Sequence, residues 1–365
     1  MSRIKDIIQH LESVAPLSYQ ESYDNSGLLT GNKDNIVTGV LVTLDVTEKV
    51  VEEALNTNCN LIIAHHPIIF KGLKTLTGSN YVERTVILAL KNDIAIYAIH
   101  TNLDNVNTGV NKKICDKIGL VNTQVLSPKK DTLAKLVTFV PNDAIDKVKM
   151  AIFEAGAGQI GNYNDCNFVV QGVGEFTPNE KANPTIGKTN KPEQVNESRI
   201  EVLLPSHLSS KVLAALNHAH PYEEVAYYLT PLQNKDQTVG AGMIGELEEA
   251  MPAKKFLQFL KNKMDLDIIR HTALIKENIK TVAVCGGAGS FLLPVAIGRQ
   301  ADVFVSADFK YHEFFDAEDK IVIADIGHYE SEVYTKDLII DILSEKFSTF
   351  ALNLSKTVTN PISYI

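Results

Sequence analysis

Histidines and carboxylates follow three apolar segments of this sequence, at points where the chain would leave buried strands. The segments are residues 61–64, 94–99 and 321–326. The polar side chains behind them are, in order, His65 and His66, then His100 and Asp104, then His328 and Glu332. Imidazole nitrogens suit zinc, iron, nickel and copper, and carboxylate oxygens extend the choice toward manganese and can bridge two ions. The pattern therefore points to metal chemistry.

The elements expected around these residues would place them at one edge of a sheet. Open α/β sheets build their sites outside the carboxyl ends of their strands. Neighbouring residues of a regular strand point to opposite faces, but just past a strand end His65 and His66 can splay toward two ions. His328 and Glu332 are four residues apart and share one face if Gly327 opens a helix. We therefore expect a site for two ions.

Each of these residues also has a structural interpretation. A single histidine is most often hydrogen-bonded to the backbone, whereas two adjacent buried imidazoles are costly unless they are paired or metallated. His100 could be a ligand, a group that orients a ligand, or a base near the substrate, and we favour the last two. Lys310 and His312 follow another apolar segment and are candidates for substrate contacts. Surface positions or the orientation of a ligand are the alternatives for these two residues.

The same motifs resemble those of a known family. Residues 23–28 (Tyr-Asp-Asn-Ser-Gly-Leu), 65–67, 100–104 and 327–332 are similar to motifs of the NIF-three-like dinuclear metal proteins, also called the GTP cyclohydrolase I type 2 family. The resemblance covers roughly residues 1–125 and 246–365. It implies a dinuclear site with a bridging carboxylate, built from His65, His66, Asp104, His328 and Glu332. Tyr23 stands where relatives often have Trp, which concerns packing near the site and not the ligand set.

Composition and charge narrow the function classes. The 365 residues, 45% hydrophobic and 22% charged, suffice for two or three domains with a sizeable core. No stretch approaches the roughly 20 apolar residues of a membrane span, and the amino terminus reads as an amphipathic helix from about Ser2 and not as a signal peptide. A net charge of −9 argues against broad nucleic-acid binding. The four cysteines lack C-x-x-C spacing, which fits a cytoplasmic protein without a zinc ribbon or disulfide framework.

An internal repeat marks an inserted domain. Val140-Pro141 recurs 64 residues later as Leu204-Pro205, and the residues behind each pair follow the same pattern. Each copy reads strand, helix, strand, and two such halves predict a ferredoxin-like (α+β) domain over about residues 130–235. Residues 174–196, rich in Pro, Asn, Lys, Gly and Thr, are expected to form a long mobile loop between the halves.

The insert resembles the PII-like and CutA-like domains of longer family members through residues 220–224 (His-Pro-Tyr-Glu-Glu). His218, His220 and Glu223 could bind a metal ion or small ligand there, or could simply form a surface turn after a helix. The expected domains are a first α/β half over residues 1–128, the PII/CutA-like insert over 129–240, and a second α/β half over 241–365.

The two flanking segments predict an open α/β core in two halves, because strand and helix patterns alternate in each. Strands are expected over 40–44, 61–64, 94–99, 281–285, 303–305 and 321–326, and helices over 47–56, 81–92, 253–263 and 291–299. Residues 286–290 (Gly-Gly-Ala-Gly-Ser) could present backbone N–H groups to a phosphate. A tight turn from strand to helix explains these glycines equally well.

The resulting hypothesis is a dinuclear metal-dependent hydrolase that activates water for attack on a nucleotide or related small substrate. Two divalent ions per chain are expected, with zinc first and iron, manganese, nickel or cobalt as alternatives. The resemblance implies GTP cyclohydrolase activity and a homohexameric toroid with trimeric caps made by the inserts, although nothing in the sequence selects guanine. The alternatives are a metal-dependent phosphoesterase and a non-enzymatic metal-binding protein of regulation or assembly. The sequence assigns no catalytic residue.

Overall fold

The computed structural model describes residues 2–365 and divides into two compact units. Residues up to Pro128 fold together with Gln237–Ile365, and Lys129–Asp236 form the other unit. Both units mix helices and strands, as expected for an α/β core with an α+β insert. Within residues 2–365, no helix is long and apolar enough to cross a membrane.

The first sheet of the flanking unit has the strand order β1-β4-β3-β2-β15. Its strands are β1 (Gly27–Thr30), β2 (Gly39–Thr43), β3 (Leu61–Ala64), β4 (Ala95–Ala98) and β15 (Ala351–Leu354). All run parallel except β1, which is antiparallel to β4. Ile62 and Ile63 of β3 belong to core clusters on opposite faces, which explains why this strand reads as a continuous apolar run.

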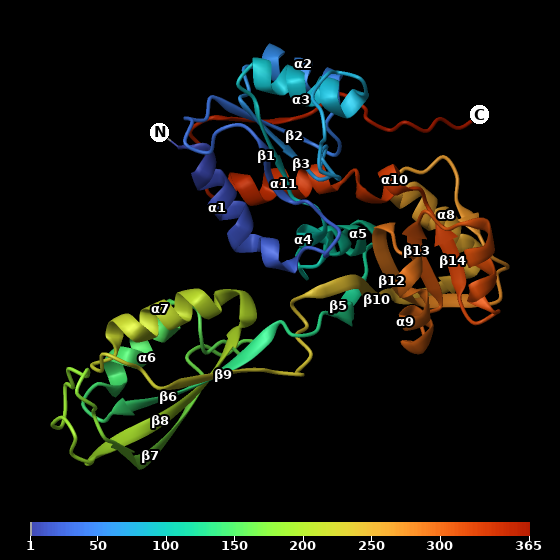
Figure 1. Ribbon diagram of the computed structural model, residues 1–365. Coiled ribbons are helices and arrows are strands. Elements are labelled where there is room, and N and C mark those ends of the chain that lie inside the picture. Colours follow the sequence, from blue (N-terminus) through green and yellow to red (C-terminus); the bar gives the residue numbers. More distant parts are fainter. Residues whose placement is uncertain (1) are drawn as a thin grey trace. The chain divides into compact units, whose positions relative to one another are not determined.

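Helices cover both faces of the first sheet (Figure 1). They are α2 (Glu48–Asn56) and α3 (Tyr81–Lys91) on one face, and α1 (Ile4–Val14) and α11 (Thr335–Ser344) on the other. The side chains of Thr47 and Asn80 accept hydrogen bonds from the first turns of α2 and α3, which fixes where these helices begin. The helix expected from about Ser2 begins at Ile4.

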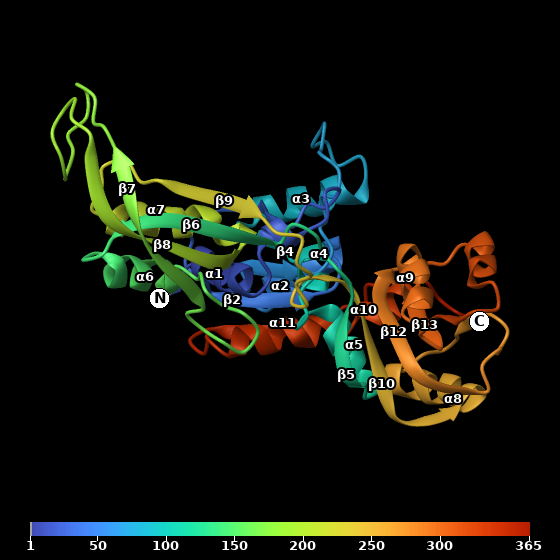
Figure 2. The same cartoon turned by 90° about the horizontal axis from the view of Figure 1, so that it is seen from below.

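The second sheet has the strand order β11-β14-β13-β12-β10-β5. Its strands are β5 (Val121–Pro128), β10 (Gly240–Pro252), β11 (Arg270–His271), β12 (Asn278–Ala288), β13 (Val303–Ala307) and β14 (Val322–Asp325). β12, β13 and β14 are parallel, and the other pairings are antiparallel. Helices α5 (Val110–Ile118) and α8 (Ala253–Met264) pack on one face, and η3 (Ser290–Leu292) with α9 (Leu293–Gly298) pack on the other (Figure 2).

One buried cluster joins the two sheets of the flanking unit. It contains Val42 and Ile63 of the first sheet, Val284 and Val305 of the second, and apolar residues of α1, α5, α8 and α11. This shared core holds the strand ends of the two sheets at fixed distances from one another. Four short helical elements complete the unit: η1 (Leu17–Tyr19), α4 (Thr101–Asp104), η4 (Tyr311–Ala317) and α10 (His328–Glu332).

The intervening unit is an antiparallel sheet, β7-β8-β6-β9, with helices on one face (Figure 2). Its elements are β6 (Leu133–Pro141), α6 (Ile145–Glu154), β7 (Asn167–Phe176), β8 (Glu193–Pro205), η2 (Ser206–Leu208), α7 (Ser209–Ala219) and β9 (Tyr227–Pro231). Strands and helices follow the order of a β-α-β-β-α-β motif. The predicted loop over 174–196 is shorter than expected, since Gly174 to Phe176 pair with Glu193 to Val195 and extend the hairpin.

Candidate metal centre

Five strands of the flanking unit end in residues that gather at one place. Asp45 follows β2, His65 and His66 follow β3, His100 follows β4, Asp308 follows β13, and His328 follows β14. These strands run parallel within their sheets, so their carboxyl ends lie along one edge of each sheet. The structure brings together all five residues that the sequence predicted as ligands: His65, His66, Asp104, His328 and Glu332.

The inner group consists of His65, Asp104 and Glu332. His65 is fully buried, and its Nδ1–H donates to the carbonyl oxygen of Ile99 over 2.9 Å. Its Nε2 lies 3.6 Å from Asp104 Oδ1 and 3.8 Å from Glu332 Oε1. Within residues 2–365, neither His65 Nε2 nor Asp104 Oδ1 has a hydrogen-bond partner, although both atoms are buried.

These two unpartnered atoms fit a metal ion. A buried polar atom without a partner costs free energy, and a cation between an imidazole nitrogen and a carboxylate oxygen would satisfy both. Ligand atoms bound about 2.0–2.2 Å from one ion lie about 3–4 Å from each other. The separations of 3.6 and 3.8 Å around His65 Nε2 are in this range and are too long for hydrogen bonds.

The outer group consists of His66, His328 and the same Glu332. Glu332 Oε2 lies 2.9 Å from His66 Nε2 and 3.1 Å from His328 Nε2, and these two nitrogens are 3.3 Å apart. Each imidazole donates its other N–H to an aspartate: His66 Nδ1 is 2.8 Å from Asp45 Oδ1, and His328 Nδ1 is 2.7 Å from Asp308 Oδ2. Both Nε2 atoms are thereby directed at Glu332.

Positive charge is strongly favoured in the outer group. Burial alone would lower the pKa of His66, but its hydrogen bonds to Asp45 and Glu332 raise the pKa to about 9. Burial likewise opposes protonation of His328, whose pKa is raised to about 11 by Asp308 and Glu332. Burial would raise the pKa of Glu332, but the neighbouring imidazoles hold it well below its usual range. Such a site is electrostatically prepared for cations.

Asp104 belongs to the inner group and behaves differently. Burial, together with the charge of Glu332, raises the pKa of the Asp104 carboxyl to about 7. Two carboxylates in one buried site repel each other unless a positive charge lies between them. A cation bound between Asp104 and Glu332 would relieve this repulsion.

The glycines of residues 286–290 make room for Glu332. A Cβ at Gly287 would lie 2.5 Å from Glu332 Oε1, and the Gly287 backbone has a φ of +60°. The N–H of Gly286 donates to Asn111 Oδ1 over 3.0 Å, and the N–H of Gly287 donates to Ser331 Oγ over 2.9 Å. Because both N–H groups are bonded within the protein, the structure agrees better with a tight turn that allows close packing than with the phosphate contact considered from the sequence.

His100 lies beside the cluster and is held by the early motif of the chain. Its Nδ1–H donates to Asp24 Oδ1 over 2.8 Å. The other oxygen of Asp24 accepts from the backbone N–H of Thr101 at 3.0 Å and from the Thr101 hydroxyl. A ring nitrogen of His100 falls within 4.8 Å of ligand atoms of His65 and His66. This arrangement suits either the binding of an ion or contact with a substrate.

Two exposed aromatic rings continue outward from His100. The Phe70 ring is 6.3 Å from that of His100, and the Tyr23 ring is 6.3 Å from that of Phe70, measured between centroids. Tyr23 is 62% exposed and Phe70 is 44% exposed. Tyr23 thus contacts Phe70, which in turn contacts His100, so its ring packs near the cluster and outside the ligand set.

Lys310 and His312 make their described contacts elsewhere. The Lys310 side chain is largely exposed, with its Nζ 3.9 Å from Glu313 Oε1. The His312 ring stacks on Phe315 with centroids 6.3 Å apart. Among residues 2–365, no hydrogen bond, ion pair or ring contact found for these two side chains reaches the five clustered residues. Their role as substrate contacts stays a prediction.

The second histidine motif serves the structure of the intervening unit. His220 is buried, its Nε2–H donates to the Phe139 carbonyl oxygen over 2.9 Å, and its Nδ1 accepts from the Tyr222 N–H over 3.1 Å. Both ring nitrogens are therefore occupied, which leaves none for a metal ion. The surface-turn interpretation of residues 220–224 fits the structure better.

Sequence reasoning missed the three aspartates that orient the imidazoles. They are Asp24, Asp45 and Asp308. Asp45 and Asp308 carry the signal used for the other residues, a polar side chain just past an apolar strand. Asp24 carries no such signal, since it precedes β1.

Comparison with known proteins agrees with the observed fold. The family model of Duf34/NIF3 (NGG1p interacting factor 3) matches residues 2–361. Proteins called GTP cyclohydrolase 1 type 2 homolog from Halalkalibacterium halodurans and Bacillus subtilis are 39% and 36% identical, over 98% and 99% of this chain and 98% of each relative. A crystal structure of a Bacillus cereus protein related to NIF3 superposes with a TM-score of 0.87 at 37% identity, covering 100% of this chain and 99% of that one. The chain belongs to the Duf34/NIF3 family, which confirms the resemblance stated from its motifs.

Proposed function

We propose that this protein is a dinuclear metal-dependent hydrolase acting on a nucleotide or related small substrate. His65, Asp104 and Glu332 would hold one divalent ion, and His66, His328 and Glu332 would hold the other. The observation that carries the proposal is the position of Glu332. Its Oε1 lies 3.8 Å from His65 Nε2, while its Oε2 lies 2.9 Å from His66 Nε2, so one carboxylate lies between two groups of ligands.

Bound in this cluster, two divalent ions would make water acidic enough to act as a nucleophile near neutral pH and would stabilise negative charge that develops on the substrate. The chain's own residues prepare their ligands for that task. Ile99, Asp45 and Asp308 each accept a histidine Nδ1–H, which leaves Nε2 of each ring as the donor to metal. Three imidazoles and two carboxylates suit zinc first, and also iron, manganese, nickel and cobalt.

Solvent access favours catalysis over a purely structural role. Structural metal sites are closed by protein ligands, whereas catalytic sites keep a position open for water or substrate. The side chains of His328 and Asp104 are 36% and 22% exposed, so both groups reach the surface. His100, fixed by Asp24, lies beside this open side and is placed to exchange a proton with a bound substrate.

The names of the relatives supply the first substrate to test, which is GTP. The purified protein should be loaded with each candidate metal and assayed against GTP, other nucleotides and a phosphoester panel. We expect metal-dependent turnover that is lost in Glu332→Gln. Glu330→Gln, which changes a carboxylate in the same helix outside the cluster, should retain it. Two retained ions without turnover on any substrate would instead support a metal-binding protein of regulation or assembly.

We also propose that the chain assembles as the homohexameric toroid that the family resemblance implies, with the intervening units associating as trimers. The sheet of that unit supports an association surface, because Phe168 and Tyr228 are exposed. Light scattering tests this directly, and a monomer at micromolar concentration would reject the toroid.

A further inference from the structure

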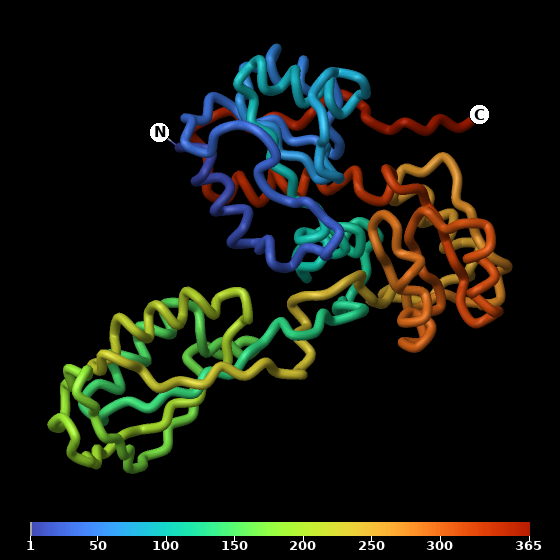
Figure 3. The backbone as a smooth tube through the Cα atoms, viewed as in Figure 1, coloured from blue at the N-terminus to red at the C-terminus, as the bar shows by residue number. Residues whose placement is uncertain are grey.

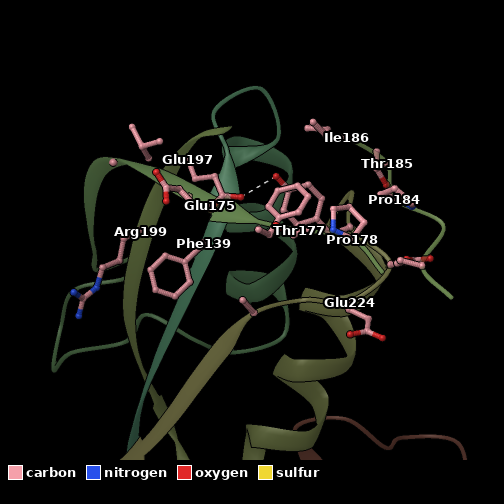
Figure 4. A pocket seen from close by; sticks show the side chains of 18 of the residues that line it. Phe139, Glu175, Thr177, Pro178, Pro184, Thr185, Ile186, Glu197, Arg199 and Glu224 are labelled. Carbon is pink, nitrogen blue, oxygen red and sulfur yellow. Dashed lines mark hydrogen bonds between the residues drawn. The ribbon is translucent and has the colours of Figure 1, made fainter. Parts of the chain in front are cut away.

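The intervening unit contains a cavity of about 970 Å³ that the metal cluster does not involve. Its lining comes from strands β6, β7 and β8, from residues 177–186 after β7, and from residues 222–226 before β9 (Figure 4). Two hydrogen bonds attach the wall formed by residues 177–186: Asn183 N–H to Glu223 Oε1 at 2.8 Å, and Thr185 Oγ1 to the Pro221 carbonyl at 2.8 Å. The volume is in the range of small-molecule sites, about 300–1,000 Å³.

The floor of the cavity includes a glycine that the fold does not require. Gly172 lies inside strand β7, opposite Glu197 of β8. A Cβ at Gly172 would meet nothing within 4 Å, and its backbone is outside the left-handed region. Glycine weakens the interior of a strand and often marks a place where a ligand approaches the backbone. Gly172 therefore leaves open space in the cavity without serving a turn or a close contact.

A buried carboxylate lies at the same floor. Glu197 is only 9% exposed, and its Oε1 accepts the hydroxyl hydrogen of Tyr222 over 2.8 Å, the bond drawn in Figure 4. Within residues 2–365, no other hydrogen bond to this carboxylate is found. Gly174 makes space for it, because a Cβ there would lie 2.2 Å from Glu197 Oε2. Glu197 Oε2 has no hydrogen-bond partner among residues 2–365 and is not one of the fully buried unpartnered atoms, so it remains open to a ligand.

Aromatic rings line the same cavity as this carboxylate. Tyr222 and Phe176 meet edge to face with centroids 6.0 Å apart, and Phe139 also lines the cavity. Aromatic faces together with a carboxylate form the environment that binds ammonium groups.

The charges around the cavity agree with a cationic ligand. The guanidinium of Arg199 is engaged by Glu201 at 2.6 Å, which leaves Lys181 as the other basic residue of the lining. Glu175, Glu223 and Glu224 add acidic groups to that of Glu197. The lining therefore has an excess of negative charge.

We infer that this cavity is a binding site for a small organic cation, an ammonium group carried on an apolar arm. The ammonium group binds Glu197 Oε2 beside the rings of Tyr222 and Phe176. The apolar arm lies over the open floor at Gly172.

The test is isothermal titration calorimetry of the full chain at pH 7 with three matched probes. The probes are 2-phenylethylammonium, which is cationic, 2-phenylethanol, which is neutral, and phenylacetate, which is anionic. We expect the cation to bind at least about tenfold more tightly than either of the others, a difference of about 1.4 kcal/mol. Equal affinities, or no heat with the cation up to millimolar concentration, would overturn the inference.

Three variants locate the binding. Glu197→Gln keeps the shape of the side chain and removes its charge, and Gly172→Leu fills the open space of the cavity at residue 172. Each variant should bind the cation at least about tenfold more weakly. Glu154→Gln, an exposed carboxylate at the end of α6 in the same unit, should leave the affinity unchanged. Thermal melting checks that each variant is folded. If Gly172→Leu does not fold, the affinity of Glu197→Gln for the cation alone tests the site. Cation binding that is unchanged in the folded variants would reject this site.

Discussion

The inner and outer groups of the cluster share Glu332 but satisfy their polar atoms in different ways. In the inner group, His65 Nε2 and Asp104 Oδ1 are buried without hydrogen-bond partners among residues 2–365. In the outer group, His66 and His328 are fully hydrogen-bonded, and their pKa values are raised to about 9 and about 11. Protons can therefore replace a metal ion in the outer group up to about pH 9, whereas in the inner group a proton on Asp104 would do so only below about pH 7. We infer that the outer ion competes with protons more strongly than the inner ion.

The largest effect is expected from Glu332→Gln, because this carboxylate belongs to both groups. The substitution should reduce bound metal from about two ions per chain to less than one. It removes the negative charge that the clustered imidazoles and both ions require. Elemental analysis after mild dialysis measures the ratio, and Glu330→Gln serves as the control. Two ions retained by Glu332→Gln would show that the groups do not depend on a shared carboxylate.

Removing one histidine from each group should separate the two ions. His65→Ala should lose the inner ion, and His328→Ala should lose the outer ion, so each variant retains about one ion per chain. Metal content should then be measured for both variants as the pH is lowered. His65→Ala, which keeps the outer ion, should release its ion at a higher pH than His328→Ala, which keeps the inner ion. Undiminished metal in both variants would exclude these histidines as ligands.

A smaller effect is expected from the aspartates that orient the outer histidines. Asp45→Asn and Asp308→Asn should each weaken binding of the outer ion by about 10–100-fold, the usual cost of losing a residue that orients a ligand. Competition with a chelator of known affinity measures the change. Asp316→Asn, an exposed acid in η4, is the control. Equal affinities in all three variants would contradict the orienting role.

The metal-free protein should lose stability as the pH rises. Although burial opposes the charge, hydrogen bonds raise the pKa of His66 from 6.5 to about 9 and that of His328 to about 11. A raised histidine pKa contributes stability that is complete below pH 6.5 and declines as the pH rises through the folded value. Burial also raises the pKa of Asp104 to about 7, which acts in the same direction from about pH 4 upward.

Thermal melting tests this dependence with and without metal. The melting temperature of the metal-free protein should fall between pH 6.5 and 9. The metal-loaded protein should resist this fall, because the ions replace the protons as sources of positive charge. Parallel curves for the two forms would argue against metal in the cluster.

The smallest effect is expected at the carboxyl-terminal segment, which leaves β15 as extended chain (Figure 3). The Thr359 hydroxyl donates to Asp45 Oδ2 over 2.6 Å, and Asp45 in turn orients His66. Thr359→Val should therefore weaken the binding of the outer ion severalfold. Thr357→Val removes a hydroxyl that donates to Glu53 in the same segment and should leave the affinity unchanged. Competition with a chelator measures the metal affinity of both variants. Equal affinities would show that the Thr359 hydroxyl does not help Asp45 to orient His66.

Much of the outline of the cluster could be predicted from sequence. The buried parallel strands appear as continuous apolar runs, so their ends and the histidines behind them are visible. The spacing of His328 and Glu332 fits one face of α10, which begins after Gly327 as expected. Strand β10 was not predicted, because its glycines and glutamates give no apolar run, although it lies between β12 and β5.

The partners of the clustered residues could not be predicted, since they depend on three-dimensional proximity. His66 and Asp45 are 21 residues apart, and His328 and Asp308 are 20 apart, on neighbouring strands whose order the sequence does not state. Likewise, glycine is required at position 287 because a Cβ there would collide with Glu332, a residue distant in the sequence. The local sequence pattern therefore indicates which side chains lie at the carboxyl ends of the strands, and tertiary packing decides which of them contact one another.

The most direct test of the central claim is anomalous diffraction from crystals of the metal-loaded protein at the absorption edge of the bound metal. We predict two peaks in each chain, about 3.5–4 Å apart. One should lie within bonding distance of His65, Asp104 and Glu332, and the other within bonding distance of His66, His328 and Glu332. A single peak, or two peaks of which neither is bound by Glu332, would contradict the shared-carboxylate site.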